Sequence, residues 1–302
     1  MARFFHWYRR YYLLVNLPVL LLVTELVMTR IDILRRSPSS FDTALARLDA
    51  SPPGNAPTVV LLGNSATLLG MDEAQLEQSL ASSGRPMRVY NFGLAAARID
   101  DTFEVAKLLL AKGVKPKLVV LGVNPFLIDD RVNSDSRFPW LHRTTPYLYF
   151  HRSRLRSMLK KLLRSSVDNP EELGLAGTNI VQTRAQREFG VEAFAREFDH
   201  RPIDDFPLLD QLPAFLHWLS RNGIASYVVL LPLSPDGKAR LSNYRELMAA
   251  LKNKLPPNFL DLVDKYDYSA FADVGHVNAI GRKQMTAAIA AWLEALPEVA
   301  VQ

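Results

Sequence analysis

The chain of 302 residues contains no cysteine. Disulfides, thiolate metal sites and a cysteine nucleophile are therefore excluded. The sequence also lacks a phosphate-binding loop, because Gly63 to Gly70 has neither the lysine nor the glycine pattern that such a loop needs. Outside one motif described below, the histidines are scattered without the spacing of metal ligands. We accordingly predict neither a metal nor a cofactor.

The charge balance is also modest. There are 36 lysines and arginines against 31 acidic residues, a net charge of +5, which is too small to imply nucleic acid by itself. Hydrophobic residues make up 48% of the chain, which is ample for a core. The length fits one decorated α/β domain or two small domains.

One long apolar run stands at the start of the chain. Tyr11 to Met28 is almost wholly apolar and follows Arg3, Arg9 and Arg10. A bilayer core needs about 20 apolar residues, and no small-residue cleavage site follows this run. We predict an uncleaved transmembrane signal anchor over residues 1–36; the alternative is a buried core helix. A tether rich in Pro, Ser and Ala follows over residues 37–57.

Strands alternate with helices from Thr58 to the end of the chain. The predicted strands are Thr58 to Leu62, Arg88 to Phe92, Lys117 to Leu121, Ala225 to Leu231 and Phe259 to Val263. The predicted helices are Met71 to Ser83, Asp100 to Lys112, Leu208 to Arg221 and Ala279 to Leu296. This alternation is typical of an α/β domain with a doubly wound parallel sheet, here over residues 58–302.

Residues 126–207 lack strand signals, and we predict a helical cap inserted into that domain. One helix within it would gather apolar side chains on one face and basic ones around them. The apolar residues are Leu155, Met158, Leu159, Leu162 and Leu163. Such a helix suits a membrane surface or membrane partner, or equally the outside of the domain itself.

Polar residues follow several of the predicted strands. Gly63-Asn64-Ser65 ends the first, Asn91-Phe92-Gly93 the second and Gly122-Val123-Asn124 the third, whereas Asp273 and His276 precede the last helix. Each group alone could be an ordinary turn. Because ligands bind beyond the carboxyl ends of parallel strands, their joint occurrence predicts one site at one sheet edge.

These residue types fit nucleophilic catalysis. A serine hydroxyl needs a histidine to take its proton and a carboxylate to orient that histidine, and Ser65, His276 and Asp273 would fill these roles. A developing oxyanion needs fixed donors. The backbone amides of Ser65 and Gly93, with the side-chain amide of Asn124, could supply them.

The three polar segments after the strands and the segment from Asp273 to His276 resemble the four sequence blocks of the SGNH (GDSL-like) hydrolase superfamily. The resemblance extends over most of Thr58 to Leu296. The first block, Gly-Asp-Ser in many members, corresponds to Gly63-Asn64-Ser65. The third, Gly-x-Asn-Asp, corresponds to Gly122-Val123-Asn124-Pro125, in which proline replaces the final aspartate. Gly93 matches the second block, and Asp273-Val274-Gly275-His276 matches Asp-x-x-His in full. The resemblance implies a flavodoxin-like three-layer sandwich with a catalytic serine.

With its N-terminal run, the chain looks like the membrane-anchored branch that includes the D-alanyl-lipoteichoic acid protein DltD and the alginate O-acetylation proteins AlgJ and AlgX. That resemblance implies a single-pass protein of the inner membrane whose catalytic domain faces the periplasm or cell exterior. It further implies a serine acyltransferase or esterase that acts on a cell-surface polysaccharide or polymer beside a membrane-bound O-acyltransferase. A non-catalytic assembly partner of that enzyme and a free-standing lipid or carbohydrate esterase are the alternatives.

Overall fold

The computed structural model describes residues 57–94, 97–129 and 206–296, together with Asn16, Val19, Leu20, Val23, Asp49 and Ile203. The chain divides into two compact units, residues 1–39 with 134–168 and residues 40–133 with 169–302. Asn16, Val19, Leu20 and Val23 are the described residues of the first unit. The fold given below is that of the second unit.

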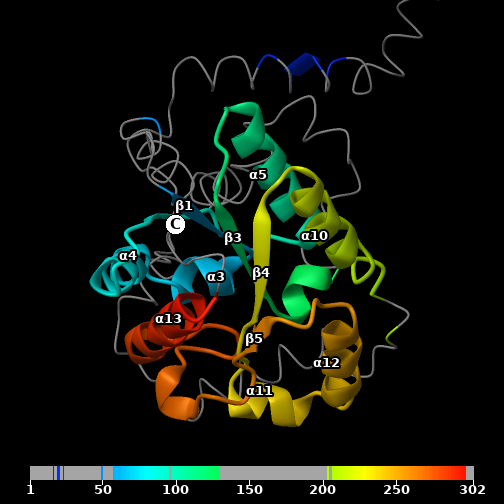
Figure 1. Ribbon diagram of the computed structural model, residues 1–302. Coiled ribbons are helices and arrows are strands. Elements are labelled where there is room, and N and C mark those ends of the chain that lie inside the picture. Colours follow the sequence, from blue (N-terminus) through cyan, green and yellow to red (C-terminus); the bar gives the residue numbers. More distant parts are fainter. Residues whose placement is uncertain are drawn as a thin grey trace, which may run out of the picture. The chain divides into compact units, whose positions relative to one another are not determined.

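A five-stranded parallel sheet forms the centre of this unit (Figure 1). The strands are β1 (Thr58–Leu62), β2 (Arg88–Asn91), β3 (Leu118–Val123), β4 (Ala225–Leu230) and β5 (Phe259–Asp261). Their order is β2-β1-β3-β4-β5. The predicted α/β fold with a parallel sheet is confirmed, and the order is that of flavodoxin-like doubly wound sheets.

Helices cover both faces of the sheet (Figure 1). They are α3 (Ser65–Gly70), α4 (Glu73–Ser82), α5 (Ile99–Ala111), α10 (Gln211–Arg221), α11 (Pro235–Arg240), α12 (Tyr244–Asn253) and α13 (Ala279–Glu294), with 3-10 helices η2 (Pro125–Ile128) and η6 (Tyr268–Ala270). Helices α4 and α13 pack together on one face. Helices α5 and α10 lie on the other, as right-handed crossovers require when the strand order reverses at β1.

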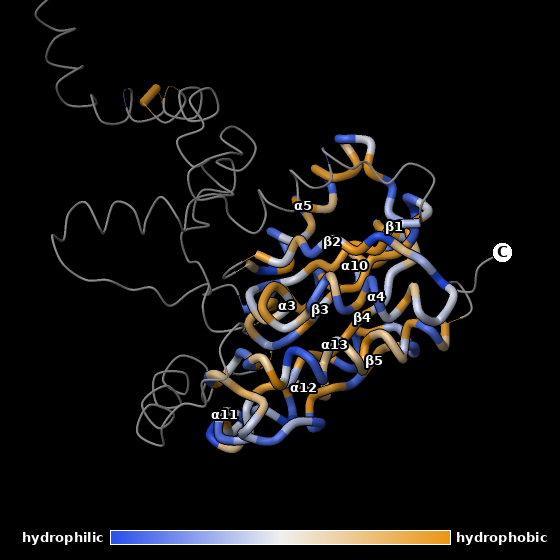
Figure 2. Tube along the Cα trace, turned by 90° about the vertical axis from the view of Figure 1, so that its left-hand side faces the viewer, coloured by the Kyte–Doolittle hydropathy of each residue, from blue (hydrophilic) through white to orange (hydrophobic). Residues whose placement is uncertain are grey.

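Burial on both faces explains why β1 is continuously apolar. Alternate side chains of a strand point to opposite faces, and all five residues of β1 are buried. Val59 and Leu61 belong to the core that includes Leu76 of α4 and Ile289 of α13. Figure 2 shows the hydrophobic residues gathered along the strands and the inner sides of the helices.

On the opposite face an aromatic group joins two helices. The ring of Phe103 in α5 lies 5.1 Å from that of Phe215 and 4.9 Å from that of Trp218, both in α10. Offset and edge-on aromatic pairs of this kind add to the free energy gained by burial alone. Together the two faces make three layers with the sheet in the middle.

The structure differs from the prediction around the first helix. The segment predicted as one helix from Met71 to Ser83 is α4, and a separate short helix, α3, precedes it and begins at Ser65. Asn64 caps α3, so the strand passes into the helix within two residues. Strand β3 extends beyond its predicted end to Val123, which makes Asn124 the first residue after it.

Helices α11 and α12 were not predicted, although α12 carries a clear signal. Its buried residues are Tyr244, Leu247, Met248 and Leu251. Their spacing of three, four and seven residues is the helical repeat of one apolar face.

Several predicted segments lie mainly outside the described residues. These are the anchor at 1–36, the tether at 37–57 and most of the cap at 126–207, including Leu155 to Leu163. Among the described residues there is no helix both long and apolar enough to cross a bilayer. The described positions of the anchor are helical, and Val19, Leu20 and Val23 are 56%, 60% and 50% exposed.

Candidate active site

The sheet order places a ligand site at the carboxyl ends of β1 and β3. The chain leaves β1 towards β2 on one side and later returns to β3 on the other, which opens a crevice between the loops that follow these strands. Ser65 is the third residue after β1, and Asn124 is the first residue after β3. The loop from η6 to α13 brings Asp273 and His276 to the same edge.

Ser65, His276 and Asp273 form a continuous hydrogen-bonded relay. The Oγ atom of Ser65 lies 2.8 Å from Nε2 of His276. The other ring nitrogen, Nδ1, lies 2.8 Å and 2.9 Å from the two carboxylate oxygens of Asp273. A carboxylate on Nδ1 fixes the tautomer in which Nε2 has the free lone pair, so His276 can accept the serine proton.

The Asp273 to His276 segment is a compact turn held by its own backbone. One carboxylate oxygen of Asp273 accepts the amide hydrogens of Gly275 and His276, each at 2.8 Å. The amide of Ala272 donates to the carbonyl of His276 at 2.9 Å. These bonds explain how an aspartate only three residues before the histidine reaches its ring.

Neighbouring elements hold this turn in place. The side-chain amide of Asn278 donates to the carbonyl of Ser269 at 2.7 Å, and its oxygen caps α13 by accepting from Ile280 and Gly281. The amide of Ser234, at the start of α11, donates to the carbonyl of Val274 at 2.9 Å. The turn is therefore fastened to α11 and α13.

The environment of Asp273 lowers the pKa of its carboxyl group. Burial alone would raise that pKa, but the hydrogen bond and charge of the His276 ring and the amides of Gly275 and His276 outweigh it. Because the pKa is depressed in the folded state, ionised Asp273 stabilises the fold above about pH 4, and this contribution is lost as the pH falls through its folded pKa.

This shift predicts a pH dependence of stability. Ionised Asp273 stabilises the fold, so Asp273→Asn should unfold more easily than the wild type at neutral pH. We expect the difference in the free energy of unfolding between the two proteins, measured in urea, to shrink as the pH is lowered through about 4. A difference that stays constant over this range would show that the charge of Asp273 does not contribute to stability.

The turn before the serine requires glycine. Gly63 has φ +145°, a conformation that side-chain-bearing residues rarely adopt. A Cβ atom at Gly63 would also lie 2.1 Å from the hydroxyl of Thr67 and 2.7 Å from the carbonyl oxygen of Gly122. The chain therefore turns sharply here and presents Ser65 as the first residue of α3. The first amides of a helix have no acceptor within that helix, so the Ser65 amide is placed to donate to a ligand.

Asn124 presents a second unused donor. It is 1% exposed, and its Oδ1 atom accepts from the amide of Leu127 at 3.2 Å and from the side chain of Asn64 at 2.8 Å. Its Nδ2 atom is buried and has no partner within the described part of the chain. Such an unsatisfied donor is costly unless a ligand uses it, which fits the predicted oxyanion role.

The third predicted donor has another partner. The amide of Gly93 donates to Oδ1 of Asn91 at 2.9 Å. A Cβ atom at Gly93 would lie 2.7 Å from the amide nitrogen of Leu68 and 3.1 Å from the carbonyl oxygen of Asn64. Close packing against α3 therefore accounts for this glycine, and an oxyanion would have to compete with Asn91 for the Gly93 amide.

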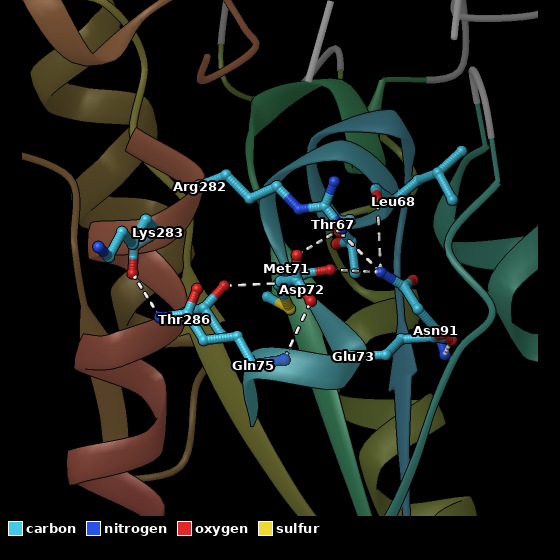
Figure 3. A network of polar contacts seen from close by, with 10 residues as sticks. All are labelled: Thr67, Leu68, Met71, Asp72, Glu73, Gln75, Asn91, Arg282, Lys283 and Thr286. Carbon is cyan, nitrogen blue, oxygen red and sulfur yellow. Dashed lines mark hydrogen bonds and ion pairs between the residues drawn. The ribbon is translucent and has the colours of Figure 1, made fainter. Parts of the chain in front are cut away.

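Asn91 is the centre of the polar network in Figure 3. Its side-chain amide donates to the carbonyls of Thr67 and Met71, at 3.2 Å and 3.0 Å, at the end of α3. Its backbone amide donates to Glu73. The network fastens α3, and with it Ser65, to the end of β2.

The next residues continue this network to α13. The backbone amide of Asp72 donates to the hydroxyl of Thr286 at 3.0 Å, and its carboxylate lies 3.1 Å from Arg282. Sequence reasoning gave no role to Asn64 or to the side chain of Asn91. Their positions, one residue before the serine and two residues before the glycine of the second block, were the available signal.

Within the described residues no cluster of three or more histidines and carboxylates could hold a metal ion. The chemistry that the geometry allows is attack by the Ser65 hydroxyl, with His276 as base, on an electrophilic carbonyl whose oxygen can bind the Ser65 amide and Asn124.

No family model and no curated protein matches the chain. Solved structures to which the chain is similar include a protein assigned to the G-D-S-L lipolytic family from Desulfitobacterium hafniense DCB-2, with 15% identity, TM-score 0.40, and coverage of 78% of this chain and 99% of that one. A lipase/acylhydrolase from Enterococcus faecalis has 13% identity, TM-score 0.43, and coverage of 79% and 95%. The acetyl xylan esterase AlAXEase has 14% identity, TM-score 0.39, and coverage of 79% and 100%.

Likeness at this level carries no information on substrate or reaction, which must come from the site itself. The molecule contains an α/β unit with a five-stranded parallel sheet whose switch-point edge carries a serine, a histidine and an aspartate in hydrogen-bonding contact.

Proposed function

We propose that the protein is a serine-dependent ester hydrolase or acyltransferase of the SGNH type. The observation that carries this proposal is the relay from Ser65 through His276 to Asp273, with every contact between 2.8 and 2.9 Å. It stands at the switch point of a doubly wound sheet, where ligands bind in this architecture.

In the first half of the reaction Ser65 becomes acylated. Its Oγ atom attacks the carbonyl carbon of an ester while Nε2 of His276 takes the hydroxyl proton. The carbonyl oxygen becomes an oxyanion, which accepts hydrogen bonds from the Ser65 amide and Nδ2 of Asn124. Collapse of this intermediate breaks the ester C–O bond, and His276 returns the proton to the leaving alcohol.

The second half of the reaction frees the serine. Water or an acceptor hydroxyl attacks the acyl-serine carbonyl while His276 takes the proton of the attacking hydroxyl. The bond from the carbonyl carbon to the Ser65 oxygen then breaks, and His276 gives that proton to Ser65. With water the product is a free acid, and with a sugar or polyol hydroxyl it is a new ester. The same three residues serve both outcomes.

We further propose that the protein is held at the inner membrane by residues 1–36, with its catalytic unit facing the periplasm or cell exterior. The apolar run from Tyr11 to Met28 supports this, as do the exposed, helical Val19, Leu20 and Val23 within it. The substrates would be acyl groups of a cell-surface polysaccharide or polymer, and the partner a membrane-bound O-acyltransferase.

The nucleophile is tested by fluorophosphonate labelling of the full-length protein in detergent. We expect one phosphonyl group on the wild-type protein, attached to Ser65, and none on the Ser65→Ala variant. Ser82→Ala is the matched control, because that serine lies on the exposed side of α4 and should not affect labelling. A Ser65→Ala protein that is labelled as the wild type, or a wild type that is not labelled, would refute the proposed chemistry.

The absence of cysteine allows a clean test of location. We expect a single cysteine introduced as Ser82→Cys to react with a membrane-impermeant maleimide in intact spheroplasts, because that exposed position would lie outside the inner membrane. Reaction only after lysis would place the catalytic unit in the cytoplasm and remove the cell-surface polymer from consideration.

A further inference from the structure

We infer that Asn64 is a positioning residue that holds the Asn124 side chain with its amide nitrogen available to the reacting oxygen. This inference rests on the proposed function, because it concerns the donor that would stabilise the oxyanion. The contacts that support it are those of Asn64 at the start of α3 and of Asn124 at the end of β3.

The orientation of the Asn64 side chain is fixed by a backbone group. Its Oδ1 atom accepts from the amide of Ala66 at 3.1 Å, as an N-cap residue does, and a backbone amide can only donate. The other end of the carboxamide, Nδ2, must therefore be the atom that lies 2.8 Å from Asn124. The residue is 2% exposed, so water does not compete for these bonds.

The orientation of Asn124 then follows. Its Oδ1 atom receives two donors, the backbone amide of Leu127 and Nδ2 of Asn64. Turning the carboxamide by a half-turn would bring Nδ2 against two donors and lose both bonds. The favourable orientation leaves Nδ2 as the free end, and that atom is the buried donor without a partner among the described residues.

The two positions at which the chain departs from the SGNH blocks are residues 64 and 125, and both lie next to the contacts that orient Asn124. Asn64 replaces the aspartate of Gly-Asp-Ser and supplies one of the two donors. Pro125 replaces the aspartate of Gly-x-Asn-Asp and is the first residue of η2, where its fixed φ suits the turn that brings the Leu127 amide onto Asn124. A carboxamide at residue 64 can donate to Oδ1 of Asn124, which an ionised carboxylate cannot do.

The test compares the rates at which a fluorophosphonate modifies Ser65 in four full-length proteins. Asn64→Ser keeps a side-chain oxygen to cap α3 but cannot reach Asn124, so Asn124 loses one of its two fixed contacts. We expect the maximal rate of modification to fall about 10-fold in Asn64→Ser and about 100-fold in Asn124→Ala, the usual effect of losing one oxyanion donor. The concentration giving half the maximal rate should change little.

The decisive protein is the double variant Asn64→Ser with Asn124→Ala. If Asn64 acts only through Asn124, its rate should equal that of Asn124→Ala alone, because the first substitution has nothing left to misplace. Asn222→Ser makes the same substitution at an exposed position at the end of α10, away from the site, and should leave the rate unchanged.

Each remaining outcome has a definite meaning. A further 10-fold loss in the double variant, or a wild-type rate in Asn64→Ser, would overturn the inference while leaving the proposed function in place. A wild-type protein that is not modified at Ser65 would overturn both.

Discussion

Replacing His276 by alanine is expected to lower kcat for an activated ester by about 10⁴- to 10⁶-fold, with little change in KM. The reason is geometric. Nε2 of His276 lies 2.8 Å from Oγ of Ser65, so its removal takes away the base that makes the hydroxyl nucleophilic. Substrate binding would be left largely intact, because the Ser65 amide and Asn124 remain. The measurement is steady-state kinetics with a chromogenic short-chain ester.

A matched histidine provides the control. His217 is exposed on α10, and His217→Ala should retain wild-type kinetics. The double variant Ser65→Ala with His276→Ala should be no slower than Ser65→Ala alone, since groups that act as a unit lose their effect together. If His276→Ala retained more than about one hundredth of the wild-type kcat, the relay would not be the catalytic machinery.

The second large effect is on stability, at the turn before the serine. Gly63→Ala is expected to lower the free energy of unfolding by about 3 kcal/mol or more. Part of this loss comes from the φ of +145°, and part from the contacts that a methyl group would force on Thr67 and the Gly122 carbonyl. Equilibrium unfolding in urea would measure it. Fluorophosphonate labelling should also slow, because any shift that relieves the contacts moves Ser65.

A substitution at Gly84 measures the cost of the positive φ without the steric contacts. Gly84 also has a positive φ, +77°, but among the described residues no atom lies within 4 Å of a Cβ built there. Gly84→Ala should therefore cost only about 1 kcal/mol, the strain term alone, and should leave labelling unchanged. Equal losses in the two variants would show that steric contact at Gly63 contributes nothing.

Some parts of the site could be predicted from local sequence because the contacts themselves are local. Asp273 and His276 are three residues apart, and the turn between them is closed by bonds within the same segment. The strand β1 was recognisable because a continuous apolar run is what burial on both faces requires. The residues after each strand could be proposed together because parallel strands end at one edge.

Other parts depended on contacts that the sequence does not display. The predicted use of the Gly93 amide took no account of Asn91, whose side chain turns back onto that amide only because α3 packs beside β2. Helix α3 was missed because six residues give too little periodicity. Its start depends on the N-cap bond of Asn64.

The sequence by itself determined the residue types, their order along the chain and the alternation that makes a parallel α/β sheet. The tertiary structure decided which of these groups meet: Ser65 and His276 are 211 residues apart and come within 2.8 Å because β1 and the last loop end at the same edge of the sheet. It also decided which polar atoms stay free, since the Asn124 amide nitrogen is left without a described partner only when Asn64 and Leu127 occupy its oxygen. Such choices follow from packing between distant segments, where burial forces each hydrogen bond to be made or left open.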